Sequence, residues 1–222
     1  MLTRDESAIA AANMDRMYRH QRRIYDLTRK FYLLGRDGMI RGLNAGDETR
    51  VLEIGCGTAR NLIVAAKRSP GADFFGIDIS EEMLATARAN IARDMLDDAI
   101  EVAQADATAF DPKRLFGVEK FDRIFISYSL SMIPVWRSVL QQAVSVLAPR
   151  GELHIVDFGD QHGLPRFFAR ALSHWLKLFH VTPREELESE LRSLAERERA
   201  ALHFTRPFRG YAQYAVLRLP AV

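Results

Sequence analysis

Apolar positions along most of the chain alternate between strand-like runs and helix-like spacing. The predicted strands cover residues 50–54, 73–78, 100–105, 121–127 and 152–158. The predicted helices between them cover residues 59–68, 80–93 and 135–147, with Ser80 as the N-cap of the second. A turn at 148–151 is expected to lead into the fifth strand. Such alternation predicts βαβ units, and hence an α/β fold with a parallel sheet. Two last strands, over 202–205 and 211–219, are expected to form an antiparallel pair at the sheet edge.

Two other segments combine helical spacing with positive charge. From Met14 to Tyr32, apolar and aromatic residues follow a helical period and six cations accompany them. From Leu164 to Phe179, an apolar stripe runs beside a cationic stripe. This second helix either faces the core with its charges in water or lies on a membrane surface. Thr182 and Pro183 predict the start of another helix, which runs to about Arg199.

Length and composition predict an ordinary globular protein of one domain. The chain has 222 residues and a net charge of +2, so no cationic excess drives nonspecific nucleic-acid binding. Cys56 is the single cysteine, which excludes a disulfide scaffold and indicates the cytoplasm. No stretch reaches the ~20 apolar residues of a membrane span, so any membrane contact is expected to be peripheral. We expect an N-terminal helical cap over 1–45 and a main domain over 46–222, with an amphipathic insertion at 160–182.

The segment from Val51 to Ala59 carries the strongest chemical signal. A buried strand there breaks into a turn with Gly55 and Gly57 and then opens a helix. Glycines let a ligand approach the backbone, and the helix start presents unpaired N–H groups, so an adenosine-like ligand is expected. A dinucleotide fingerprint would need a third glycine where Arg60 stands, which argues against NAD.

Three acidic positions accompany this turn: Glu53 before it, Asp78 after the second strand and Asp106 after the third. Together they resemble the class I S-adenosylmethionine-dependent methyltransferases, over roughly residues 50 to 160. The resemblance implies a three-layer Rossmann-like fold, with a seven-stranded, mostly parallel sheet and an antiparallel last strand. It implies S-adenosylmethionine as cofactor, S-adenosylhomocysteine as product and no metal.

The resemblance also implies roles for individual residues. Glu53 and the glycines would lie near the methionine moiety, Asp78 at the ribose hydroxyls and Asp106 at the adenine amino group. Carboxylates accept such hydrogens well, and their charge complements the sulfonium. The alternatives are a helix N-terminal charge for Asp78 and a solvated turn for Asp106. The full expected cofactor set is Glu53, Gly55, Cys56, Gly57, Asp78, Ile79, Met83, Asp106, Ala107, Thr108 and Ser127.

The run from Met14 to Asp37 is similar to the bacterial betaine-lipid N-methyltransferases and, more distantly, to phospholipid N-methyltransferases. This resemblance implies a lipid head-group amine as acceptor and three methylations of diacylglyceryl homoserine. It also implies peripheral contact with the anionic inner face of the cytoplasmic membrane, and the enzyme that supplies the lipid precursor as a protein partner. The alternatives are a phosphatidylethanolamine-type acceptor or a small molecule.

Aromatic residues in this run suit a methylated amine. Tyr18, Tyr25 and Tyr32 are seven residues apart and stack along one helix side, where their faces attract ammonium groups. Arg29 could grip a carboxylate with two hydrogen bonds, as could Arg36. We therefore predict Tyr18 and Arg29 as substrate-binding residues and Tyr25 and Tyr32 as catalytic ones. The alternative is amphipathic packing with a solvated cationic face.

Methyl transfer needs a neutral acceptor nitrogen, so each ammonium must first lose a proton. Tyr128 and Asp157, at strand ends, are the candidate catalytic groups, with His162 on the following loop. His154 is expected to be a buried structural histidine. Proton loss directly to water needs no dedicated base.

Other functions are open on the sequence alone. The acceptor could be a small soluble amine, a hydroxyl or a quinone precursor, or the chain could be a membrane-binding sensor without turnover. Nucleic-acid methylation is less expected, because residues 127–130 read Ser-Tyr-Ser-Leu and lack the Asn/Asp-Pro-Pro-aromatic run.

Overall fold

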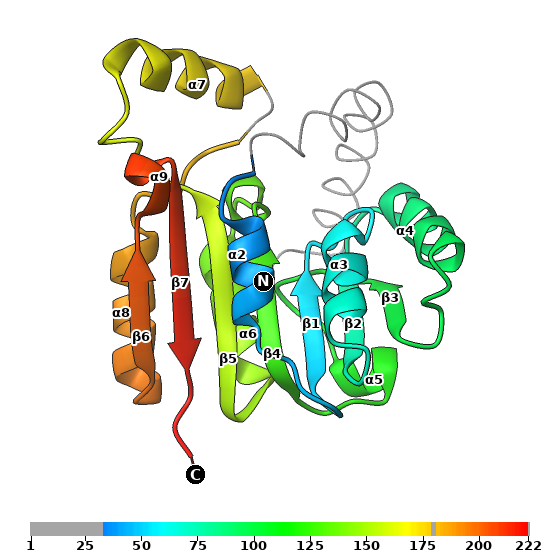
Figure 1. Ribbon diagram of the computed structural model, residues 1–222. Coiled ribbons are helices and arrows are strands. Elements are labelled where there is room, and N and C mark those ends of the chain that lie inside the picture. The colour runs from blue at the N-terminus through cyan, green and yellow to red at the C-terminus, as the bar shows by residue number, and fades with distance from the viewer. Residues whose placement is uncertain (1–32, 179–180, 222) are drawn as a thin grey trace.

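The computed structural model describes residues 33–178 and 181–221 and builds them around one seven-stranded sheet (Figure 1). The strand order is β3-β2-β1-β4-β5-β7-β6. The strands are β1 (Arg50–Ile54), β2 (Asp73–Asp78), β3 (Ile100–Gln104), β4 (Phe121–Ser127), β5 (Leu147–Phe158), β6 (Ala201–Thr205) and β7 (Ala212–Arg218). The first five strands pair in parallel, and β7 is antiparallel to both β5 and β6. The predicted fold, including the reversed last strand, is confirmed.

Helices cover both faces of the sheet and make three layers (Figure 1). One face carries α2 (Arg36–Gly42), α3 (Arg60–Arg68) and α4 (Glu81–Arg93). The other carries α5 (Pro112–Phe116), α6 (Trp136–Ser145) and α8 (Leu187–Glu198). Because successive strand residues point to opposite faces, β1 sends Val51 into one core and Leu52 into the other. Parallel strands buried on both faces explain the continuous apolar runs in the sequence.

Local signals explain where α4 begins. The Ser80 hydroxyl accepts a hydrogen bond from the Met83 amide, which confirms Ser80 as the predicted N-cap. Three short elements were not predicted, α5, the 3₁₀ turn η1 (Leu130–Met132) and α9 (Pro207–Gly210), because none is long enough to show a helical period.

The predicted turn at 148–151 lies within β5, which begins at Leu147. Arg150 there adopts a left-handed φ of 62°, so the turn-forming residues at 148–151 produce a local irregularity within the strand rather than its boundary.

The prediction that a helix begins at Thr182 is wrong, because α8 begins at Leu187. The residues that precede α8 cross the loop that follows β4. The Thr182 amide donates to the Ser131 carbonyl, and the Arg184 guanidinium donates to the carbonyls of Leu130 and Ile133 at 3.1 and 2.8 Å. These tertiary hydrogen bonds hold the segment extended, despite its capping motif.

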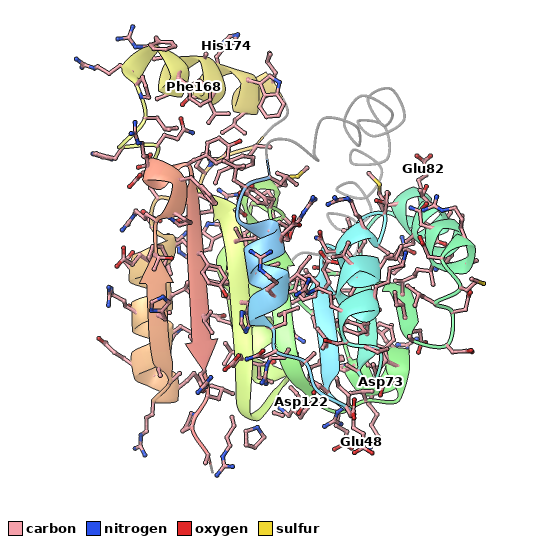
Figure 2. The ribbon with its side chains drawn as sticks, viewed as in Figure 1. Glu48, Asp73, Glu82, Asp122, Phe168 and His174 are labelled. Atoms are coloured by element: carbon pink, nitrogen blue, oxygen red, sulfur yellow. The ribbon has the colours of Figure 1, made fainter. Side chains whose placement is uncertain are left out.

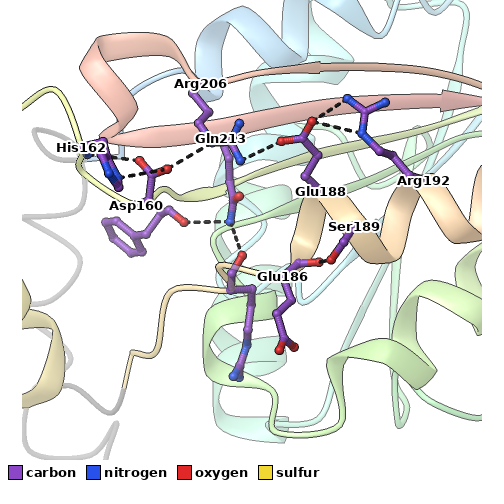
Figure 3. Close-up of polar contacts among 10 residues, drawn as sticks. Asp160, His162, Glu186, Glu188, Ser189, Arg192, Arg206 and Gln213 are labelled. Carbon is purple, nitrogen blue, oxygen red and sulfur yellow. Dashed lines mark hydrogen bonds and ion pairs between the residues drawn. The ribbon is translucent and has the colours of Figure 1, made fainter.

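The insertion after β5 forms α7 (Arg166–Leu178), which stands off the carboxyl end of the sheet (Figure 1). Polar contacts secure the base of this region (Figure 3). Arg206 contacts both Asp160, before α7, and Glu188 of α8, at 3.3 and 2.7 Å. The Gly163 amide also donates to the Arg209 carbonyl, which joins the loop before α7 to α9 (Pro207–Gly210).

A buried polar cluster joins β4, β5 and β7. The Glu152 carboxylate contacts Arg123, Arg218 and His154, and the His154 ring also contacts the Tyr214 hydroxyl at 3.1 Å. Burial lowers the pKa of His154, consistent with the predicted structural histidine. Burial opposes ionisation of Glu152, but hydrogen bonds from His154 and Arg218 lower its pKa. Arg123 also donates to the carbonyl of Leu43, which follows α2, so the cluster holds that end of the helix.

Glu152→Ala is therefore expected to destabilise the fold, because it leaves the partly buried Arg123 and the buried His154 ring without their carboxylate partner. The expected loss is about 3 kcal/mol in the free energy of unfolding, measured by urea denaturation. Glu119→Ala removes an exposed ion pair with Lys113 and is the control, with no resolvable change expected. Equal stability of the two variants would contradict this account of the cluster.

Candidate functional site

A pocket of about 190 Å³ opens where β1 ends, between α2 and α3. Its lining residues are Leu33, Arg36, Glu53, Gly55, Cys56, Thr58, Arg60, Asn61, Asn90 and Ser127. Four of the predicted cofactor residues, Glu53, Gly55, Cys56 and Ser127, are therefore brought together. Of the others, Gly57 lies in the turn after β1, Met83 lies in α4, and the rest lie at or just after the ends of the neighbouring strands β2 and β3.

The turn after β1 requires glycine at position 55 for steric reasons. Gly55 has φ +74°, and a Cβ added there would lie 2.7 Å from the Ser129 Cβ. The amides of Gly55 and Cys56 both donate to the Ile77 carbonyl, at 2.8 and 3.0 Å, which ties the turn to β2. A side chain at Gly55 would thus both strain the backbone and displace the loop after β4.

Asp78, at the end of β2, stabilises this turn through hydrogen bonds. One carboxylate oxygen accepts from the Gly57 amide at 2.8 Å, and the other accepts from the Ser80 amide at 3.0 Å. The carboxylate therefore fixes the glycine turn relative to the start of α4. The half-buried position beside the turn suits the expected contact with ribose hydroxyls.

Asp106 organises the loop after β3. Its carboxylate accepts from both the amide and the hydroxyl of Thr108, at 2.8 and 2.7 Å. The Gln104 side-chain amide donates to the Ile79 carbonyl at 2.9 Å, which joins the loops after β2 and β3. Ala107 packs against the core, and Met83 is buried in the first turn of α4.

Glu53 and Cys56 both line the pocket but differ in their chemistry. Glu53 is buried, and its carboxylate accepts a hydrogen bond from the Asn61 side chain at 2.7 Å. Burial, with the nearby Asp78 and Glu53 carboxylates, raises the pKa of the Cys56 thiol well above its usual value. Cys56 is therefore a small turn residue rather than a nucleophile.

Tyr128 and Asp157 are buried side chains that do not line the pocket. The Tyr128 hydroxyl donates to the Leu34 carbonyl at 2.5 Å, and burial raises its pKa well above the usual value. Asp157 accepts from the amides of Ser131 and Phe158 at 2.9 and 2.7 Å. Both side chains are enclosed by protein here, and their predicted catalytic role stays a prediction. His162, with a side chain 91% exposed, lies outside the pocket as well.

The predicted aromatic and cationic residues Tyr18, Tyr25, Arg29 and Tyr32 lie outside the described residues.

Several residues that line the pocket were not predicted from the sequence, among them Asn61, Asn90 and Thr58. The Asn90 side chain donates to the Thr58 carbonyl at 3.1 Å, across 32 positions. Only helical periodicity on α3 and α4 could have suggested that these asparagines face the glycine turn.

Comparison with known proteins identifies the class. A family model described as a methyltransferase domain matches residues 45–199, so the chain belongs to that family. The phosphatidylethanolamine N-methyltransferase of Cereibacter sphaeroides is 34% identical over 49% of this chain and 50% of its own length. The tRNA1(Val) (adenine(37)-N6)-methyltransferase of Porphyromonas gingivalis is 30% identical over 70% of this chain and 60% of its own. The matches thus span about half to three-fifths of the length of these relatives.

Solved structures agree on the fold. The S-adenosylmethionine-dependent methyltransferase SibL superposes with a TM-score of 0.67 at 19% identity, covering 89% of this chain and 57% of its own. Geranyl diphosphate methyltransferase in complex with SAM superposes with a TM-score of 0.63 at 14% identity, covering 84% of each chain. The chain therefore carries a methyltransferase domain and shares the fold of S-adenosylmethionine-dependent methyltransferases.

The residues of the site fit this cofactor. A glycine turn that admits no Cβ lies beside Asp78, and a buried carboxylate, Glu53, faces a pocket suited to a positively charged sulfur compound. Residues 33–178 and 181–221 contain no cluster of three or more His, Cys, Asp or Glu that could hold a metal ion.

Gly55→Ala is expected to abolish measurable binding of S-adenosylhomocysteine in calorimetry and to destabilise the protein. Gly117→Ala is the matched control, because Gly117 has a similar φ of +70° but nothing within 4 Å of an added Cβ. Gly117→Ala should lower the free energy of unfolding by about 1 kcal/mol, through backbone strain alone, and should leave ligand binding unchanged. Equal effects of the two variants on ligand binding would contradict the steric role of Gly55.

Asp157 is expected to make stability depend on pH. Burial raises its pKa from 3.8 to about 6, so the folded state binds the proton more tightly than the unfolded state. The resulting stabilisation is present below pH 4 and is lost as the pH rises through 6. Between pH 4.5 and 7.5 the wild type should lose about 2 kcal/mol relative to Asp157→Asn, measured by urea denaturation at each pH. Parallel pH profiles of the two proteins would contradict this assignment.

Proposed function

We propose that this methyltransferase acts on the amine of a lipid head group, through successive methylation of diacylglyceryl homoserine to its trimethylated betaine form. The observation that carries the proposal is an exposed apolar and cationic surface at the same end of the molecule as the cofactor pocket. The parallel strands end there, the glycine turn follows β1, and α7 follows β5.

The helix α7 has two apolar sides. Leu176 is buried, and Leu172 and Trp175 pack against the core. Phe167 and Leu178, 77% and 62% exposed, are three turns apart and therefore share an outward side. Phe168 is also exposed, and Figure 2 labels it on α7.

Charge on this helix favours an anionic partner. Residues 161–182 include no Asp or Glu, and Arg166 and Arg170 are exposed beside the aromatic side chains. Basic residues near an anionic leaflet contribute roughly 1 kcal/mol each to binding. This combination of exposed aromatic residues and cations is typical of a helix that lies in a membrane interface.

Neighbouring segments extend the surface. Leu34 and Phe208 are exposed, and Phe208 lies against Gly35 at the start of α2. Among the large hydrophobic residues exposed in the described part of the chain, Met95 alone lies elsewhere, after α4. None of the described helices is both long enough and apolar enough to span a bilayer. The proposed contact is therefore peripheral, at the inner face of the cytoplasmic membrane.

The chemistry requires placement more than acid–base groups. S-Adenosylmethionine, when bound, would supply a methyl group on a sulfonium for transfer to a neutral amine. Glu53 is the one carboxylate among the described residues that line the pocket, and it would attract the cationic methionyl end. With Tyr128 and Asp157 buried behind the site, the acceptor ammonium would lose its proton to water. The similarity to a phosphatidylethanolamine N-methyltransferase supports an amine acceptor and keeps that lipid as the alternative substrate.

The substrate is tested by incubating the protein with radiolabelled S-adenosylmethionine and vesicles that contain diacylglyceryl homoserine. Labelled mono-, di- and trimethylated lipid is expected by thin-layer chromatography. Parallel vesicles with phosphatidylethanolamine test the alternative. Label in a soluble acceptor but in neither lipid would contradict the proposal.

Membrane contact is tested by flotation with vesicles containing phosphatidylglycerol. The double variant Phe167→Ser, Phe168→Ser should reduce the bound fraction at least tenfold, because it removes two exposed aromatic side chains from the interface. Met95→Ser is the control, since Met95 is 88% exposed at another place on the surface. Equal binding of the double variant and the wild type would overturn the role of α7.

A further inference from the structure

The loop after β4 lies against the glycine turn but has little support of its own. The Ser129 side chain leaves no room for a Cβ at Gly55, and its hydroxyl donates to the Ile54 carbonyl at 3.1 Å. The next residues form η1, a 3₁₀ turn in which Leu130 and Ser131 are buried. Such short turns have poor hydrogen-bond geometry. Contacts with other segments must therefore hold this loop in place.

Arg184, which precedes α8, makes several of these contacts. Its guanidinium donates to the carbonyls of Leu130, Ser131 and Ile133, at 3.1, 3.4 and 2.8 Å. It also lies 6.0 Å from the ring centroid of Trp136, the first residue of α6. A planar guanidinium with five N–H donors can bind several carbonyls at once, whereas the compact ammonium of a lysine cannot match that spacing.

The backbone of Arg184 and the far side of the loop are both fixed to the sheet. The buried Gln213 side chain donates to the carbonyls of Arg184 and Phe158, at 3.0 and 2.9 Å (Figure 3). The Asp157 carboxylate accepts from the Ser131 amide at 2.9 Å. The loop is thus held from one side by the end of β5 and from the other by Arg184.

The segment that carries Arg184 is also joined to α7. The Val181 amide donates to the Leu176 carbonyl at 3.0 Å, and both of these side chains are buried. The Thr182 amide then donates to the Ser131 carbonyl at 2.9 Å. From Val181 to Arg184 the chain can span at most about 10 Å. The place where α7 packs therefore limits where the Arg184 side chain can reach.

We propose that Arg184 is a positioning residue for donor binding, which holds the loop after β4 against the glycine turn and makes the position of that loop depend on the packing of α7. Neither Arg184 nor any residue of α7 lines the cofactor pocket. Changes at the base of α7 nevertheless reach the pocket through this segment. The inference concerns the donor and does not rest on the identity of the acceptor.

Calorimetry with S-adenosylhomocysteine tests the positioning role, at a temperature where circular dichroism shows each variant to be folded. Arg184→Gln should weaken binding about tenfold, and Arg184→Lys, which can keep one of the contacts, about threefold. Arg192→Gln is the control, because Arg192 is a cation on α8 with a side chain 62% exposed, and it should change nothing. A purely structural role would lower stability but not the affinity of the folded protein. Binding by Arg184→Gln within twofold of wild type would overturn the proposal.

A double-mutant cycle tests the link to α7. Leu176→Ala, which weakens the packing of α7, should reduce the affinity for S-adenosylhomocysteine about fivefold in the wild type but less than twofold in Arg184→Gln. Leu172→Ala, at a partly buried position, repeats the cycle if Leu176→Ala does not fold. Phe167→Ser, on the exposed side of α7, is the control and should have no effect.

Independent losses that multiply in the double variant would overturn the link between α7 and the pocket. These titrations use no lipid, so their result stands whether or not the protein methylates a lipid amine.

Discussion

The close approach between the turn after β1 and the loop after β4 is the constraint on which the site depends. Gly55 faces Ser129 with no room for a side chain, and its φ lies in the left-handed region. Because of that approach, the amides of the turn are directed at the Ile77 carbonyl and at Asp78. The pocket, the acidic strand ends and the start of α3 all take their positions from this contact.

Buried polar groups then position what surrounds the pocket. Arg123 is shared between Glu152 and the Leu43 carbonyl, so the cluster between β5 and β7 also holds α2. Tyr128 performs the same function at the other end of that helix. Tyr128 and Asp157, which the sequence offers as candidate catalytic groups, also make buried hydrogen bonds that fix the segments around the pocket.

Under the proposed function, the surface around α7 would bring a lipid-anchored acceptor to the pocket. The helix is attached to the sheet through Leu172, Trp175 and Leu176 and presents other apolar side chains outward. A periodic apolar stripe would ordinarily pack wholly against a core. Here the stripe is wider than the face that packs, which leaves a surface for a further partner.

The sequence by itself determined the α/β class, the strand positions, the Ser80 cap and the glycine turn with its acidic neighbours. These features depend on local spacing and on the steric needs of single residues, which a sequence records directly. Tertiary structure alone decided that α8 starts late, that Tyr128 and Asp157 are enclosed, and that Arg36 joins Glu53 in one pocket. Each of these depends on contacts between segments distant in the chain, and residue spacing does not determine which segments will meet.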